Sequence, residues 1–174
     1  DAGQTVRYVY RVDDALYLGT QDGYVFAVHA YTGVTRWLQP VTRSGYALWR
    51  ACHVGDNVYF TTPVDIQVYE RRSGEPVARH ELQFAPGSAA VTDGQRLFLG
   101  GINRRIYALD AQTTFIDWQA LAASAIRSTP VIHEDNLYFA CDSGQIYAAT
   151  RKDKVMEWGR PASTYGPVTA NLVA

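Results

Sequence analysis

The sequence predicts an all-β fold: a β-propeller of four-stranded antiparallel blades, with about four blades in the chain. Three observations lead to this prediction. Aromatic-centred segments recur at spacings of 42, 39 and 40 residues, and a repeat of about 40 residues is typical of propeller blades. Polar pairs such as Asp22-Gly23 and Asp135-Asn136 lie between short apolar segments and favour tight hairpins. Twelve Tyr, six Phe and four Trp against one Met favour strands.

Each repeat contains several short strands. The four central aromatics are Tyr17, Tyr59, Phe98 and Tyr138. A second strand follows each of them, at residues 24–28, 66–69, 105–109 and 145–149. A strand also precedes each of them, at residues 6–10, 49–54, 87–92 and 128–132. Only residues 117–127 resemble a helix. Their place in the repeat instead predicts an outer strand followed by the connection to the next blade. We expect blades at 5–40, 46–82, 87–122 and 127–161, with a further blade starting at 164–174.

The last segment bears on how the ring closes. Residues 165–174 repeat the blade-opening pattern of residues 128–132. They could instead complete the first blade, but residues 6–10 already supply its opening strand. We therefore expect the remaining blades of the ring to come from a longer chain. Self-association of this chain would be the other way to close the ring.

Composition excludes several classes of protein. A hydrophobic content of 47 % with 19 % charged residues is typical of a globular domain. The formal net charge of −1 argues against nucleic-acid binding. No apolar stretch reaches the roughly 20 residues of a transmembrane helix. The chain starts at Asp1 without a signal peptide, so either a leader was removed or the chain is an excised piece. Cys52 and Cys141, with no CxxC pattern or clustered His, predict buried free thiols and no metal site.

A tryptophan ends the third strand signal in three repeats, at Trp37, Trp118 and Trp158. Residues 106–118 resemble the tryptophan-docking motif of PQQ-like propeller repeats, Ala-x-Asp-x-x-Thr-Gly-x-x-x-Trp. Residues 25–37 match it with a His in place of the Asp, and residues 146–158 match more weakly. The second repeat keeps Ser73-Gly74 but has Ala78 or Arg79 where the Trp belongs. WD repeats are the alternative, but their Gly-His and Trp-Asp signatures are missing. We expect the three tryptophans to dock blades together. The resemblance also implies that the complete ring has seven or eight blades.

The resemblance also bears on function. Quinoprotein dehydrogenases of this superfamily bind pyrroloquinoline quinone and Ca²⁺, with a vicinal Cys pair and a Glu/Asn/Asp calcium set. No such pattern is present here, and we expect His29, His53, His80 and His133 to be turn or surface residues. Members without cofactor residues act as rigid platforms, such as the lipoprotein scaffold of the outer-membrane β-barrel assembly machinery, or as sensor domains attached to kinases. The resemblance implies a bacterial, periplasmic or otherwise extracytoplasmic scaffold that binds a protein or peptide, without catalytic residues or cofactor. A fragment of a quinoprotein oxidoreductase is the alternative.

Aligning the opening strands of the blades on Pro130 places a ring of residues near the mouth of the channel. It comprises Arg7, Tyr8, Trp49, Arg50 and Arg127, with Ser88, Ala89, Ser128 and Thr129 between them. Three arginines and a Trp would suit an acidic or extended peptide. In the alternative interpretation, Trp49 packs between blades and the arginines are solvated or pair with turn carboxylates.

Overall fold

The protein is described here by a computed structural model covering residues 5–41, 49–153, 161–164 and 166–168. All 16 regular elements in these residues are β-strands, and they form four sheets of four antiparallel strands. The predicted fold class, a β-propeller of four-stranded antiparallel blades, is confirmed. The chain divides into two compact units, Asp1–Gln83 and Phe84–Ala174, each of which holds two blades.

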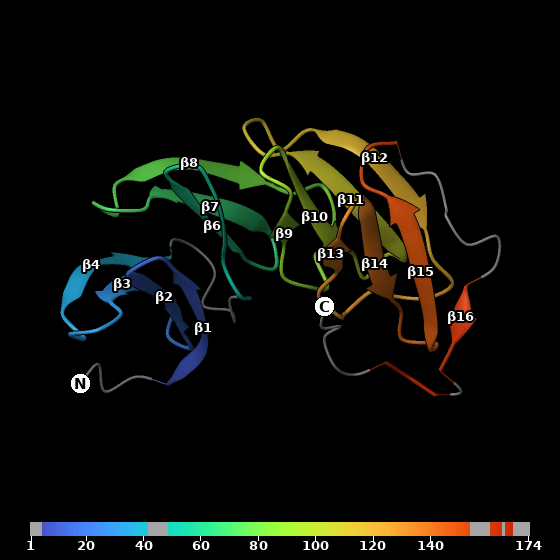
Figure 1. Ribbon diagram of the computed structural model, residues 1–174, viewed down its shortest axis with the longest axis horizontal. Helices are drawn as coiled ribbons and strands as arrows, with labels where there is room; N and C mark the ends of the chain where they lie inside the picture. The colour runs from blue at the N-terminus through green and yellow to red at the C-terminus, as the bar shows by residue number, and fades with distance from the viewer. Residues whose placement is uncertain (1–4, 42–48, 154–160, 165, 169–174) are drawn as a thin grey trace. The chain divides into compact units, whose positions relative to one another are not determined.

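The first unit contains blades 1 and 2, in which consecutive strands pair with each other (Figure 1). Blade 1 consists of β1 (Val6–Val12), β2 (Ala15–Thr20), β3 (Tyr24–His29) and β4 (Thr35–Pro40). Blade 2 consists of β5 (Cys52–Val54), β6 (Asn57–Thr61), β7 (Asp65–Glu70) and β8 (Pro76–Glu81). Side chains of both blades form one buried cluster, which includes Tyr17, Val25, Trp37, Val58, Phe60 and Tyr69. This cluster joins the two sheets, because each sheet covers an apolar face of the other.

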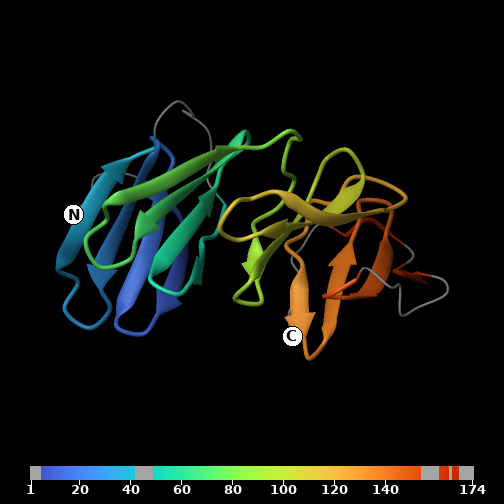
Figure 2. The ribbon, with the colours of Figure 1, turned by 90° about the horizontal axis from the view of Figure 1, so that it is seen from above.

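The second unit repeats this plan, and Figure 2 shows its two sheets from above in yellow-green and orange. Blade 3 consists of β9 (Val91–Thr92), β10 (Arg96–Gly100), β11 (Arg105–Asp110) and β12 (Ile116–Leu121). Blade 4 consists of β13 (Val131–His133), β14 (Asn136–Ala140), β15 (Gln145–Thr150) and β16 (Ala162–Ser163). Its buried cluster includes Phe98, Ile106, Trp118, Ile126, Leu137 and Phe139.

The register explains why the repeat has an aromatic residue and a tryptophan at a constant spacing. In blade 1, Tyr17 pairs with Ala27, and Ala27 pairs with Trp37. The two rings therefore flank a small residue in the same row of the sheet, and their centroids are 6.0 Å apart. Blade 3 has the same row, with Phe98 and Trp118 at 5.9 Å. In blade 2, Val68 pairs with Ala78. Ala78, and not Arg79, therefore occupies the tryptophan position of this row.

The tryptophan of the first blade in each unit is anchored to the second blade. The indole Nε1 of Trp37 donates a hydrogen bond of 2.9 Å to the carbonyl oxygen of Arg71. In the second unit, Trp118 donates one of 3.0 Å to the carbonyl oxygen of Arg151. Both tryptophans are buried. A buried indole whose N–H is satisfied can contribute its whole apolar area to the junction of two blades.

The turn between the third and fourth strands shows why the motif contains an acidic residue and a glycine. In blade 3, Asp110 Oδ1 accepts hydrogen bonds from the backbone N–H groups of Gln112 and Thr113. These bonds hold the pKa of Asp110 below its usual value. The turn then needs a positive φ, which is +74° at Gly74 and +56° at Thr114. Glycine adopts this conformation without the strain that a Cβ atom adds.

The opening strands of blades 2 to 4 begin later than the sequence predicts. Strands were expected from residues 49, 87 and 128, whereas β5, β9 and β13 begin at Cys52, Val91 and Val131. In two of these blades, a serine side chain hydrogen-bonds to the backbone of the second strand where the opening strand does not pair with it. Ser88 Oγ accepts from the Gly100 N–H at 2.8 Å, and Ser128 Oγ donates to the Ala140 carbonyl at 3.1 Å. These side-chain bonds satisfy backbone groups that a longer strand would have paired.

Blade 4 ends in a short outer strand. β16 pairs with β15 only through Ala162 and Ser163. Trp158 lies outside the described residues, as do Tyr165 and residues 169–174. The predicted docking role of Trp158 and the predicted start of a further blade therefore stay predictions.

Candidate partner-binding surface

The opening segments of blades 1 and 2 bring the predicted rim residue Arg50 together with two residues that were not predicted there, Tyr10 and His53. The Tyr10 hydroxyl, on β1, lies 2.9 Å from Nδ1 of His53, on β5. Arg50, two residues before β5, places its guanidinium carbon 5.1 Å from the centre of the Tyr10 ring, which is within cation–π distance. We call Tyr10, Arg50 and His53 the Tyr10 cluster. It combines one exposed cation with an aromatic ring and a hydrogen-bonded imidazole.

Electrostatics leave this cluster with a single positive charge near neutral pH. Burial raises the pKa of Tyr10 above its usual value. Burial, together with the nearby Arg71 guanidinium, lowers the pKa of His53 below its usual value, against an opposite effect of Asp13. Both shifts favour the uncharged forms of the two rings. The charge available to a partner is therefore that of Arg50.

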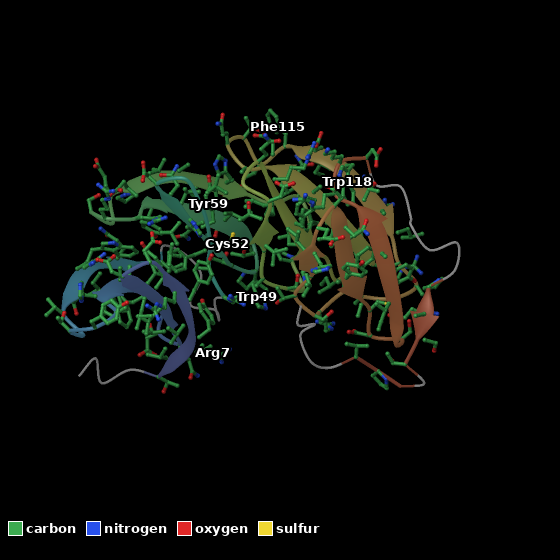
Figure 3. All side chains as sticks on the ribbon, viewed as in Figure 1. Arg7, Trp49, Cys52, Tyr59, Phe115 and Trp118 are labelled. Atoms are coloured by element: carbon green, nitrogen blue, oxygen red, sulfur yellow. The ribbon has the colours of Figure 1, made fainter. Side chains whose placement is uncertain are left out.

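Two other predicted rim residues lie in the same unit (Figure 3). Arg7 is exposed on β1. Trp49 is half-buried just ahead of β5, and its backbone N–H donates to the Thr61 carbonyl at 3.3 Å. Among the residues that the structure describes, neither Arg7 nor Arg50 forms an ion pair with a carboxylate. Both guanidinium groups are thus available to an acidic ligand.

Tyr8 has a different environment. It pairs with Gly19 across β1 and β2, and its phenol ring occupies the space that a Cβ atom on Gly19 would need. Its hydroxyl is buried and has no hydrogen-bond partner within the described part of the chain, and burial raises its pKa. Tyr8 therefore packs within blade 1.

The remaining predicted rim residues belong to the second unit. Arg127 Nε forms an ion pair of 3.0 Å with Asp142 Oδ2, and its side chain is 60 % exposed. Ser88, Ala89 and Ser128 are buried. The structure thus groups Arg50 with Tyr10 and His53, and it gives Arg127 a carboxylate partner of its own.

Sequence analysis did not identify Tyr10 and His53 as members of this surface. His53 was expected to be a turn or surface histidine, and Tyr10 was treated only as part of a strand. Their contact joins residues 43 positions apart. That separation is close to one repeat, so two equivalent strands of adjacent blades carry the pair. This spacing is the only signal in the sequence, and the register was needed to interpret it.

Two features are absent from the described residues. No group of three or more His, Cys, Asp or Glu side chains in these residues could hold a metal ion. No helix long and apolar enough to cross a membrane occurs among them.

The repeated row of aromatic and tryptophan residues, and the tryptophan bonds between blades, define a β-propeller built of tryptophan-docked blades. The sequence profile of one family, described as outer membrane protein assembly factor BamB, matches residues 64–172, which is more than half of the chain. The chain belongs to this BamB family. The match confirms the resemblance to PQQ-like repeats, and it favours the scaffold interpretation over the quinoprotein oxidoreductase alternative.

Solved structures show the same fold. BamB from Moraxella catarrhalis superposes with a TM-score of 0.77 at 25 % identity, over 96 % of this chain and 53 % of that protein. The computationally designed Ika8 protein superposes with a TM-score of 0.79 at 16 % identity, over 95 % of this chain and 51 % of the design. This chain thus spans about half the length of the two structures. No curated protein sequence is significantly similar to it.

Proposed function

We propose that this chain is a non-catalytic scaffold that binds an acidic, extended segment of a protein partner outside the cytoplasm. The observation that carries the proposal is the Tyr10 cluster, in which Arg50 lies over the Tyr10 ring with no carboxylate partner among the described residues. A guanidinium held by an aromatic ring is oriented before binding, so less side-chain entropy is lost when a carboxylate arrives.

Membership of the BamB family supports the scaffold role and the extracytoplasmic location, since the family is described as an outer membrane protein assembly factor. The fold supports it as well. Tyr10 and His53 lie on the paired strands β1 and β5, so the ring that faces Arg50 is held in place before a partner arrives. Fractionation of cells that express the protein would test the location.

A charge-matched peptide titration tests the proposed binding. The probe is a capped, fluorescently labelled peptide of four Glu-Thr repeats, and its counterpart has Gln in place of Glu. We expect the double variant Arg7→Ala/Arg50→Ala to bind the Glu peptide about tenfold more weakly than the unmodified protein. The control is Arg72→Ala/Lys152→Ala, which removes the same charge from two exposed turn positions.

The control separates local recognition from long-range attraction between charges. If the two double variants lost the same affinity for the Glu peptide, only net charge would matter, and the proposal would be overturned. Equal affinity for the Glu and Gln peptides would overturn it too, since carboxylate recognition is its basis.

A further inference from the structure

A groove of about 320 Å³ lies between the two blades of the first unit. The outer strand β4 of blade 1 forms one side, and β7 and β8 of blade 2 form the other. Its lining includes Pro40, Gln67, Tyr69, Pro76, Val77 and Arg79. It is separate from the Tyr10 cluster, none of whose residues line it.

At the groove, blade 2 lacks an aromatic residue that the other blades have. The third residue of the third strand is Phe26 in blade 1, Tyr107 in blade 3 and Tyr147 in blade 4. In blade 2 it is Gln67. The register confirms the equivalence, since Gln67 pairs with Phe60 as Tyr147 pairs with Phe139.

The second unit shows what fills the corresponding space. The Tyr147 ring of blade 4 stacks on Phe139, with centroids 5.0 Å apart. Its hydroxyl accepts a hydrogen bond of 2.9 Å from the backbone N–H of Ala123, just after the outer strand of blade 3. The protein's own aromatic side chain therefore reaches across that blade junction. In the first unit no side chain of this size is present at the equivalent position.

A buried polar network forms the floor of the groove. The Asp65 side chain is fully buried and accepts hydrogen bonds from Gln67 Nε2 at 3.3 Å and Arg79 Nε at 2.5 Å. Tyr69 donates its hydroxyl proton to Gln67 Oε1 at 2.9 Å. Because Asp65 neutralises Arg79, the groove presents a fixed guanidinium plane with little net charge. Arg79 keeps 31 % of its side chain exposed.

The chemistry of the groove fits a neutral aromatic ring. Pro40, Pro76 and Val77 provide apolar walls, and the Arg79 guanidinium provides a flat face on which an aromatic ring can stack. An acidic side chain would gain little here, because the positive charge of Arg79 is already compensated by the buried Asp65.

We propose that this groove binds an aromatic side chain, Phe or Tyr, presented by the partner polypeptide, in the place that Tyr147 fills in the second unit. The inference rests on the proposed function, because it adds a second contact for the same kind of partner. It uses a different surface and different chemistry: the rim recognises carboxylates, and the groove recognises an uncharged ring.

The test is a nuclear magnetic resonance titration of the ¹⁵N-labelled 174-residue chain with two capped tripeptides, Gly-Phe-Gly and Gly-Glu-Gly. We expect the Phe probe to shift the amide signals of Gln67, Val77 and Arg79, and to bind at least about fivefold more tightly than the Glu probe. Equal binding of the two probes, or no shifts at the groove up to the highest soluble probe concentration, would overturn the inference.

Two variants locate the binding. Gln67→Tyr restores the aromatic residue of the other blades and should weaken binding of the Phe probe by about tenfold or more. Gln112→Tyr is its control, because blade 1 already has a tyrosine, Tyr31, at the position equivalent to Gln112. If Gln67→Tyr does not fold, Val77→Asp tests the wall of the same groove. Val77 is 53 % exposed, and the substitution should weaken binding of the Phe probe by a similar factor. Unchanged binding in the folded groove variants would refute the site.

The two proposals can fail separately. Arg7→Ala/Arg50→Ala should leave binding of the Phe probe unchanged. If the acidic peptide still binds the rim while the Phe probe does not bind the groove, only the present inference fails. If the acidic peptide does not bind while the Phe probe does, the rim proposal fails and the groove remains a binding site.

Discussion

Gly74 of blade 2 lies directly against the indole ring of Trp37 of blade 1. A Cβ atom added to Gly74 would lie 2.5 Å from Trp37 Cγ, which is closer than real contacts allow. The glycine thus serves two purposes. It allows the φ of +74° that its turn needs, and it leaves room for the tryptophan that anchors the preceding blade through the Arg71 carbonyl.

Gly74→Ala should therefore destabilise the protein more than Gly33→Ala. Gly33 occupies the same turn position in blade 1 with a φ of +70°, and a Cβ atom there would meet nothing within 4 Å. The backbone strain of about 1–2 kcal/mol is common to both variants. Only Gly74→Ala adds the overpacking cost, of about 1–3 kcal/mol. Urea unfolding of the two variants gives the difference.

The combination with Trp37→Leu shows whether the indole is the cause. In the Trp37→Leu background, the extra cost of Gly74→Ala over Gly33→Ala should shrink, because the two residues are in contact and their effects are not additive. Equal costs of the two glycine variants in the unmodified protein would contradict the close-contact interpretation.

Trp118→Ala should destabilise the protein more than Trp49→Ala. Trp118 is buried and its indole N–H is bonded to the Arg151 carbonyl, so truncation should cost about 3–5 kcal/mol. Trp49 is only half-buried, and its loss should cost about 1–2 kcal/mol. The measurement is the shift in urea midpoint. Equal shifts would show that the docking motif does not distinguish structural tryptophans from others.

Acidification should weaken the protein through His53. Because the pKa of His53 is lower in the folded state, the unfolded chain binds the proton more readily. The stability that results is present above about pH 6.5 and is lost as the pH falls through that value toward the folded pKa. The measurement is the free energy of unfolding at pH 8 and pH 5. His53→Gln should reduce the decrease in unfolding free energy between pH 8 and pH 5. His133→Gln is the matched control.

The outcome for His53 depends on the difference between the two variants. If both histidine variants retain the same pH dependence as the unmodified protein, the half-buried imidazole beside Tyr10 is not the group that titrates.

The two cysteines should differ in reactivity in the folded protein. Both are buried and unbridged. Burial raises the pKa of Cys52 to about 12. For Cys141, burial acts in the same direction, but hydrogen bonds involving Ser124 and Ser143 outweigh it and lower the pKa below its usual value. Since the thiolate is the nucleophile, iodoacetamide should label Cys141 faster than Cys52, as followed by peptide mass spectrometry.

Denaturation provides the internal control for this prediction. In urea both thiols should react at the same rate, and two thiols per chain should be found. Faster labelling of Cys52 in the native state, or fewer than two thiols in urea, would contradict the environments described.

The sequence alone was sufficient for the fold class and the repeat. Each repeat of about 40 residues has one central aromatic residue, such as Tyr17 or Phe98, and hairpin pairs separate its strands. A local sequence pattern therefore specifies each blade. The docking motif directed attention to Trp37 and Trp118, which the structure shows buried against the next blade. These features are readable because propeller blades are local units, built from strands that are neighbours in sequence.

Apart from the tryptophan docking, the contacts between blades came only from the tertiary structure. The pairing of Tyr10 with His53, and the groove beside Gln67, join strands of different blades. Side chains such as Tyr8 and Ser88, which the sequence alignment placed on a rim, are partly or fully buried. A repeat pattern tells which residues occupy equivalent rows. It does not tell which of them reach a neighbouring blade, because that depends on how two sheets pack and on which side chain fills the space between them.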